Sequence, residues 1–306
     1  MQPNNLFELS RLKHTKSLFW LAVSCVVVAV ALIPLWILDS RQLLGVSVWE
    51  KPIKFYISVA IFSFTSSWLS SFLTRGGRWV KLTGFVIAVS LAVEIVIILA
   101  MASIGETSHF NVSTPTAIAI WSIMATFISI VLFSTIFISL MIMFQKQHEF
   151  NLKLALALGS LNTAVGMGLA YLMTWPTATQ LANYQGIAGA HAVGVSDGGP
   201  GLPFLGWSTV AGDLRVGHFF GLHSIQVAAI LLAISLLLPI AFRIPLIVVG
   251  NVTWLGFVGL VTWQSLRAEP FTSPSQPTLT GFGALLAVTA VSFTFLVIWQ
   301  LRKENK

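Results

Sequence analysis

The sequence predicts an all-α fold, a polytopic transmembrane bundle of about eight helices. Hydrophobic residues make up 56% of the 306 residues and charged residues only 9%, with a mean hydropathy of +0.86. A soluble domain carries about 25% charged residues. The apolar runs are long, contain glycine and lack the ~10-residue alternation of barrel strands, so they favour helices.

Eight segments are long enough for a hydrocarbon core of ~30 Å, which needs roughly 20 residues per helix. The predicted helices are 18–38, 53–73, 82–104, 117–144, 154–175, 217–240, 246–264 and 282–300. With short loops between most of them, residues 1–306 are interpreted as a single membrane domain.

Local signals support several of these helices. The run 18–38 is too long for a signal-peptide core and lacks a small-residue cleavage site, so we expect it to remain as a helix. Pro52 suits the first turn of the second helix, and Pro115 starts the fourth. The sixth has Asp213 in a good position for an N-cap.

The fifth helix has a stripe of small residues that predicts close contact with another helix. The stripe consists of Gly159, Thr163, Gly166 and Ala170. Its neighbour Asn162 is interpreted as an interhelical hydrogen-bond donor.

Loop charges predict the orientation. Only Arg41, Lys51, Lys54, Arg215 and Arg267 fall on one side of the predicted bundle, and the remaining lysines and arginines fall on the other. The positive-inside rule therefore places both termini in the cytoplasm. A bacterial inner membrane fits this multi-pass pattern, with the lipid bilayer as the principal partner.

The net charge of +7 follows from this topology and from attraction to anionic lipid, and nothing indicates nucleic-acid binding. Lone Cys25 excludes an internal disulfide framework. Whether the chain forms a homo-oligomer or joins a membrane complex stays open.

The longest predicted loop, 176–216, lies on the periplasmic side and is interpreted as a folded cap. Loops of this length in a compact domain are usually functional or disordered. Thr177 to Gln180 resembles a capping box, and Gly186 is positioned to end the short helix that it starts.

The most informative segment is Gly212–Gln226, which opens the sixth helix with ionisable residues. Such groups at the mouth of a membrane helix usually face the bundle interior or a wet cavity, so they indicate a functional site. By topology this segment shares the periplasmic half with other polar residues. The candidate site residues are Lys54, Glu94, His109, Asp213, Arg215, His218, His223 and Gln226.

Glu94 lies deepest of the acids, ten positions before the end of the predicted third helix, or about 15 Å down at 1.5 Å per residue. A carboxylate there is costly unless it is paired, hydrated or protonated. A structural role would pair Glu94 with Gln226 or a serine. A functional role would make it a proton relay, an ion ligand or a partner of His223.

His218 and His223 cannot easily bind one ion together, because five residues at 100° each leave them about 140° apart on a helix. Each would pair with another element, most plausibly through His109 or His191. Arg215 shares a face with His218, and Gln226 shares one with His223.

Three functions fit these residues. The first is a redox protein with haem b or a divalent metal, ligated by His109, His218 or His223. In this interpretation Arg215 or Lys54 neutralises haem propionates and Glu94 handles protons. A metal would add a carboxylate such as Asp213.

The second function is a proton- or ion-coupled transporter of a small solute bound on the periplasmic side, with Glu94 as the coupling acid. The third is a structural or assembly subunit of a membrane complex. In that case Asp213 is only an N-cap, and Arg215 pairs with it or contacts lipid headgroups. The sequence does not decide whether the protein is an enzyme.

Several polar segments resemble those of an uncharacterised family of bacterial polytopic inner-membrane proteins with no assigned activity. The segments are Lys51–Phe55, Ser108–Asn111, Gly212–Arg215, His218–Phe219 and Gly221–His223. The resemblance covers the second to the sixth predicted helix. It implies a shared fold and a site on the outer face, without a substrate or cofactor.

Overall fold

A computed structural model describes Leu6 and residues 8–145 and 149–304. The chain is 72% helical with almost no sheet, which confirms an all-α helical bundle. Six described helices are long and apolar enough to cross a membrane, or up to seven if one bent pair is a single span. These helices indicate a multi-pass membrane protein.

The chain divides into two compact units, which are described separately. The N unit comprises Leu9–Ser134 and Tyr171–Gly206, and the C unit comprises Met1–Glu8, Thr135–Ala170 and Trp207–Lys306. The predicted cap loop is therefore divided, since residues up to Gly206 belong to the N unit and those from Trp207 to the C unit.

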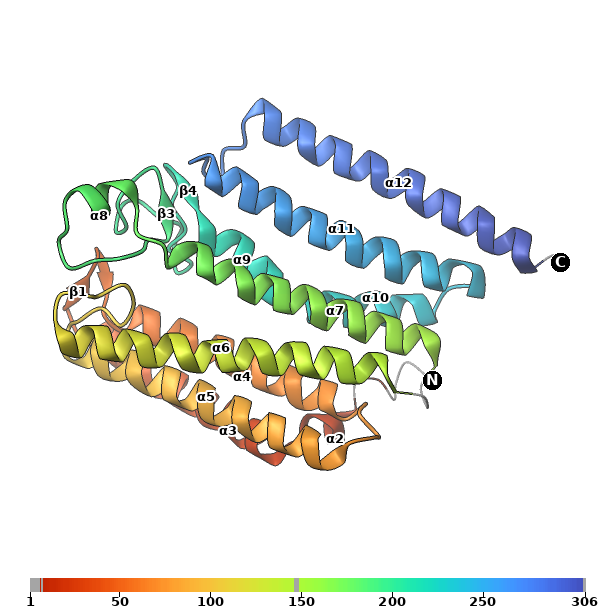
Figure 1. Cartoon of the computed structure of the whole chain (residues 1–306), viewed down its shortest axis with the longest axis horizontal. Coiled ribbons are helices and arrows are strands. Elements are labelled where there is room, and N and C mark those ends of the chain that lie inside the picture. The colour runs from red at the N-terminus through yellow and green to blue at the C-terminus, as the bar shows by residue number, and fades with distance from the viewer. Residues whose placement is uncertain (1–5, 7, 146–148, 305–306) are drawn as a thin grey trace. The chain divides into compact units, whose positions relative to one another are not determined.

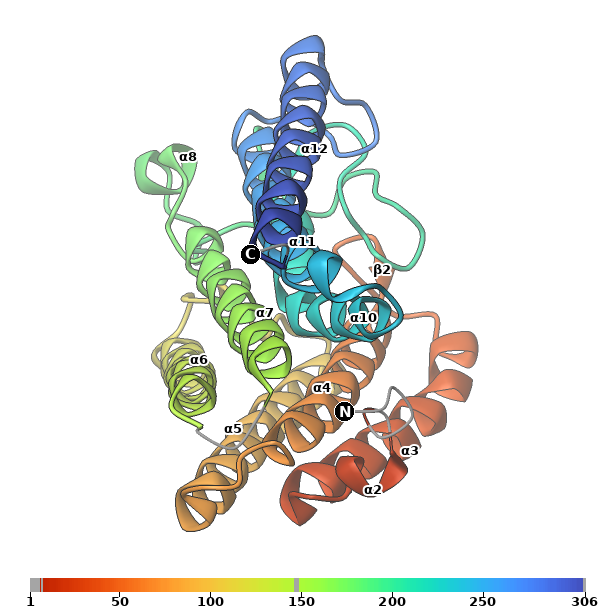
Figure 2. The ribbon, with the colours of Figure 1, turned by 90° about the vertical axis from the view of Figure 1, so that its right-hand side faces the viewer.

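Three long helices form the body of the N unit: α3 (Lys16–Leu38), α4 (Glu50–Ser70) and α5 (Gly77–Ser103). Each packs against the other two (Figure 1 and Figure 2). The unit also has the short α2 (Leu9–Leu12) and the first part of α6 (Pro115–Met143). Helix α4 begins three residues before the predicted start at residue 53, so that Pro52 lies in its first turn as expected.

The connections of the N unit contain short elements. A hairpin of β1 (Gln42–Leu43) and β2 (Val46–Ser47) joins α3 to α4. The segment after residue 170 holds part of the 3-10 helix η1 (Leu169–Met173), α8 (Ala178–Ala182) and β3 (Ala192–Val193). The capping box at Thr177 and Gln180 is confirmed, whereas α8 ends before Asn183 and Gly186 lies in the following turn at φ +77°.

The C unit is built from α7 (Phe150–Gly168), α9 (Leu214–Leu222), α10 (Ser224–Leu236), α11 (Ile240–Leu266) and α12 (Gln276–Glu304), with β4 (Gly212–Asp213) before α9. Helix α7 packs against α9, α10 and α11, and α11 also packs against α12 (Figure 1). The small-residue stripe explains this packing. At Gly166 an added Cβ would lie 2.2 Å from the carbonyl carbon of Gly221.

The predicted helix 217–240 is not straight. It consists of α9 and α10, which meet at His223 with a bend of 44°. Side chains satisfy the backbone groups that the bend frees. Ile225 N donates to Thr163 Oγ1 over 3.0 Å, and Phe220 O accepts from Trp254 Nε1 over 3.1 Å. Contacts with α7 and α11 thus stabilise a break that carries no proline.

Candidate functional site

The predicted site residues fall into two sets. Lys54, Glu94 and His109 lie in the N unit. The others, Asp213, Arg215, His218, His223 and Gln226, lie in the C unit.

Glu94 is a buried carboxyl in the middle of α5. It is 6% exposed and lies nine residues before Ser103, where α5 ends, or about 14 Å along the helix axis. Its Oε1 has no hydrogen-bond partner within the part of the chain that the structure describes. The carboxyl group of Glu94 interacts electrostatically with Lys51, which lies in the first turn of α4.

Lys51 in turn contacts His109, which lies in the loop between α5 and α6. The Lys51 Nζ is 3.2 Å from His109 Nδ1, and the Ser108 hydroxyl is 2.9 Å from the same nitrogen. An ammonium group can only donate, so Nδ1 is the acceptor and the proton of the neutral ring lies on Nε2. Lys51 thus contacts a loop histidine and interacts electrostatically with the buried Glu94.

Burial lowers the pKa of His109 well below its usual value of 6.5, and the positive charges of Lys51 and His191 lower it further. The ring also packs against aromatic side chains, with centroids 5.2 Å from Trp121 and 5.8 Å from Phe55. These surroundings hold His109 in the neutral form at physiological pH.

A second imidazole, His191, is oriented by Asp197. The two side chains are 2.7 Å apart, and the carboxylate also accepts the backbone N–H groups of His191 and Ala192. Burial opposes ionisation of Asp197, but the bonds from His191 and Ala192 outweigh it and lower its pKa to about 2. Phe110 lies beside His191, with ring centroids 4.9 Å apart.

Lys54 does not join this cluster through a direct hydrogen bond. Its Nζ pairs with Glu50 at 2.8 Å, one helical turn earlier on α4, and lies 5.8 Å from the Phe204 ring centroid. Lys51, three residues earlier on α4, makes the contact with His109.

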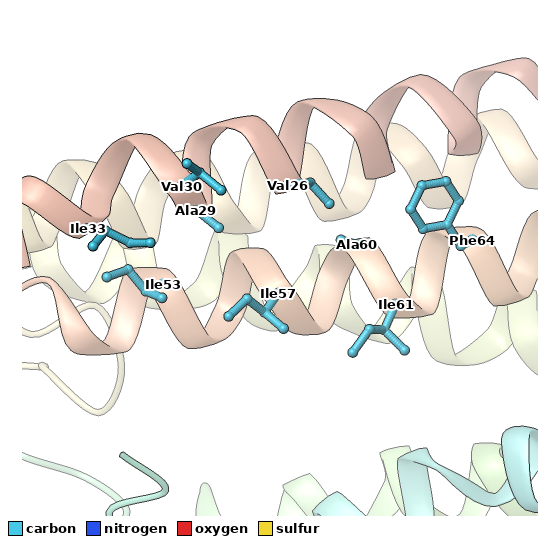
Figure 3. Close-up of a pocket in the computed structure, with 9 residues that line it drawn as sticks. All are labelled: Val26, Ala29, Val30, Ile33, Ile53, Ile57, Ala60, Ile61 and Phe64. Atoms are coloured by element: carbon cyan, nitrogen blue, oxygen red, sulfur yellow. The ribbon is translucent and has the colours of Figure 1, made fainter. Parts of the chain in front are cut away.

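A groove between α3 and α4 is apolar throughout (Figure 3). Its walls include Val26, Val30 and Ile33 of α3 and Ile57, Ile61 and Phe64 of α4. With no ionisable group in its lining, the groove suits hydrocarbon rather than the polar chemistry of the site.

In the C unit Asp213 and Arg215 pair with each other. The Asp213 side chain is fully buried, caps α9 by accepting Arg215 N, and forms two further bonds with the Arg215 guanidinium at 2.9 and 2.6 Å. It also accepts Ser208 N. These contacts anchor the start of α9, and they confirm Asp213 as its N-cap.

His218 crosses to the neighbouring helix. Its Nδ1 lies 2.8 Å from the carbonyl oxygen of Gly166 on α7. A carbonyl can only accept, so Nδ1 carries a proton and the lone pair of the neutral ring lies on Nε2. This is the arrangement in which a histidine ligates a metal, because the second nitrogen fixes the ring and its tautomer.

His223 lies at the bend between α9 and α10. Its ring packs edge-on against Phe219, with centroids 4.5 Å apart. Among the described residues, no three His, Cys, Asp or Glu side chains lie close enough to hold a metal ion.

The candidate site residues predicted from the sequence do not include Lys51, Ser108 and Asp197, although Lys51 and Ser108 lie in the segments that carry the resemblance. Lys51 and Lys54 lie on neighbouring faces of one helix turn, and sequence spacing could not separate them. Asp197 lies in a glycine-rich stretch that also fits a tight turn.

The chain matches no family model, no curated protein and no solved structure. The resemblance to bacterial inner-membrane proteins stays a prediction.

Proposed function

We propose that this protein is a proton-coupled transporter of the bacterial inner membrane, with Glu94 as the group that binds and releases the proton. The observation that supports this most directly is a buried carboxyl in an apolar helix, with one oxygen unpartnered among the described residues and an electrostatic interaction with Lys51. Ionisable groups at such a depth are costly and mark ion or proton pathways. His109, through Lys51, provides the route between Glu94 and the loop.

The proposal includes eight membrane-spanning helices and cytoplasmic termini. Helix α4 is the eighth span, in addition to the six long apolar helices and the bent pair of α9 and α10. It packs against α3 and α5, which are both long and apolar enough to cross a membrane, although its own buried serines lower its hydropathy. With this orientation the Lys51 end of α4 faces the periplasm.

Proton movement tests the proposal without knowledge of the solute. In pyranine-loaded proteoliposomes, a potassium gradient with valinomycin should drive proton entry above that of protein-free liposomes. Glu94→Gln should abolish the excess, whereas Glu106→Gln, in the loop after α5, should retain it. Full proton entry in Glu94→Gln would exclude Glu94 as the coupling acid.

A second candidate is a redox protein in which His218 ligates haem b. The observation that favours it is the bond from His218 Nδ1 to Gly166 O, which orients the ring for ligation through Nε2. Haem needs only one or two axial histidines. The described residues contain no group of three metal-ligating side chains, but haem ligation does not require one.

The dithionite-reduced minus air-oxidised optical spectrum of the purified protein decides between the two candidates. Sharp α and β bands that disappear in His218→Ala, but not in His14→Ala, would establish haem ligation. A featureless spectrum from folded protein grown with sufficient haem would exclude it.

A further inference from the structure

The buried face of α4 is polar along much of its length. Tyr56, Ser63 and Ser70 are seven residues apart and share one face, together with Ser67. All four side chains are 4% exposed or less. In an apolar helical unit such a face needs partners for its hydroxyl groups.

Two of these hydroxyl groups, those of Ser67 and Ser70, have hydrogen-bond partners. Ser70 Oγ donates to Ser66 O at 2.7 Å, and Ser67 Oγ accepts Thr15 N at 3.0 Å. The Ser63 Oγ is buried with no hydrogen-bond partner in the described part of the protein. A buried polar atom of this kind is commonly explained by an ordered water or an ion.

Two more side-chain oxygens of the N unit are buried without a hydrogen-bond partner. Glu94 Oε1 and Thr15 Oγ1 are buried and lack a partner among the described residues. The Thr15 side chain lies where three helices meet, because its backbone bonds to Ser67 of α4 and its methyl group faces Gly84 of α5.

The three oxygens lie at successive depths. Gly84 marks the level of Thr15, and Glu94 is ten residues further along α5, or about 15 Å. Ser63 is four residues beyond Ser67 on α4, or about 6 Å. Unpartnered oxygens therefore occur near one end of the unit, at an intermediate level and at the level of Glu94.

A histidine lies at each end of this series. His109 is linked to Glu94 by Lys51, and His14 precedes Thr15 in the chain. Burial lowers the pKa of His14, and the nearby charges of Lys81 and Arg11 lower it further. A histidine side chain therefore lies close to the polar residues at each end of the series.

We propose that the N unit contains a water-supported proton path that runs from Glu94 past Ser63 to the Thr15–Ser67 junction. A proton that reaches the Glu94 carboxylate forms an O–H bond there. That bond breaks when the proton passes into a file of several waters, one of them held by Ser63, and the proton leaves through water at Thr15 near His14. This inference rests on the proposed function, for which it supplies the second half of the route.

Cysteine accessibility tests the path independently of proton flux. In a Cys25→Ala background, Ser63→Cys should react with a membrane-impermeant, cationic methanethiosulfonate added from the Thr15 side. Ser58→Cys is the matched control, because Ser58 lies on the outer surface of the same helix and faces lipid, not water, in the proposed membrane-spanning arrangement. The reagent needs a hydrated thiolate, so Ser63→Cys should react at least tenfold faster than Ser58→Cys.

Equal reaction of the two cysteines would overturn the path. If Ser63→Cys does not fold, Ser67→Cys serves in the same comparison with the same expected ratio. The cysteine experiment and the proton-entry experiment on Glu94→Gln can give different answers. Loss of proton entry in Glu94→Gln with an unreactive Ser63→Cys would keep the proposed function and exclude this route. Reactive Ser63→Cys with full proton entry in Glu94→Gln would show a wet path but exclude Glu94 as its proton carrier.

Discussion

Lys51 Nζ and His109 Nδ1 lie 3.2 Å apart, and they connect the start of α4 to the loop that follows α5. Because an ammonium group cannot accept, the imidazole must be neutral to make this contact. Protonation of His109 would place two positive charges next to each other. The pair therefore couples the protonation state of a loop histidine to the lysine that acts on Glu94.

The first prediction concerns acid sensitivity. The pKa of His109 in the folded protein is lowered below 6.5, so the unfolded chain binds more protons below about pH 6.5. This group therefore lowers the free energy of unfolding as the pH falls from about 6.5. In His109→Phe, the unfolding temperature should therefore change less between about pH 6.5 and pH 5 than it does in the parent protein.

The measurement is thermal unfolding in detergent across this range. The pKa of His14 is shifted in the same direction, so the variant should reduce the acid sensitivity without abolishing it. The same pH dependence in both proteins would show that His109 is not held neutral by its surroundings.

A second prediction concerns the loop carboxylate Asp197. Its pKa in the folded protein is lowered to about 2, so its stabilisation is present above about pH 4 and is lost as the pH falls through about 2. At neutral pH, Asp197→Asn should weaken the bonds to His191 and Ala192. Amide hydrogen exchange at these two residues should become roughly tenfold faster, which corresponds to about 1.4 kcal/mol.

The control is Glu106→Gln, an exposed acid whose contact with Asn111 spans 3.4 Å. It should leave exchange at His191 and Ala192 unchanged. Unchanged exchange in Asp197→Asn would mean that the loop does not depend on this carboxylate.

A third prediction tests the close approach of α7 and α9. A Cβ at Gly166 would lie 2.2 Å from Gly221 C, and both contacting groups are backbone. Gly166→Ala should therefore lower the free energy of unfolding by about 1–3 kcal/mol. Gly168→Ala is the matched control, because an added Cβ there meets no atom within 4 Å. Equal unfolding temperatures in detergent would contradict the contact.

The features that the sequence predicted correctly are those with local causes. The long apolar runs became helices, and the stripe with Gly159 and Gly166 packs against α10 and α9. Asn162 donates to Asn251 O at 3.0 Å, as its position in an apolar helix indicated. Period, composition and capping are properties of short segments, so they can be recognised without tertiary contacts.

The features that it missed depend on contacts between distant segments. The bend at His223 is stabilised by Thr163 and Trp254, which come from two other helices. The contact between Lys51 and His109 depends on where the loop of His109 lies. By contrast, the N-cap at Asp213 was predicted correctly, because the signal for it is local in the sequence.

A fourth prediction concerns the bend itself. Thr163 Oγ1 accepts the N–H of Ile225 at 3.0 Å, and both atoms are buried. Thr163→Val keeps the shape of the side chain but leaves this N–H without an acceptor, which should cost about 1–3 kcal/mol. Thr163→Ser keeps the hydroxyl and should remain within about 1 kcal/mol of the parent protein. Thermal unfolding in detergent measures the stability of both variants. If both variants lost the same amount of stability, the effect would come from packing and not from the hydrogen bond.

The last prediction separates stability from activity at the start of α9. The fully buried Asp213 carboxylate accepts the Arg215 guanidinium, Arg215 N and Ser208 N. Asp213→Ala removes the partner of a part-buried cation and the cap of the helix, so the free energy of unfolding should fall by about 3–5 kcal/mol. Glu94→Gln should leave the unfolding temperature close to that of the parent protein while it abolishes proton entry. A stable Asp213→Ala protein without activity would reverse this assignment and make Asp213 a functional acid.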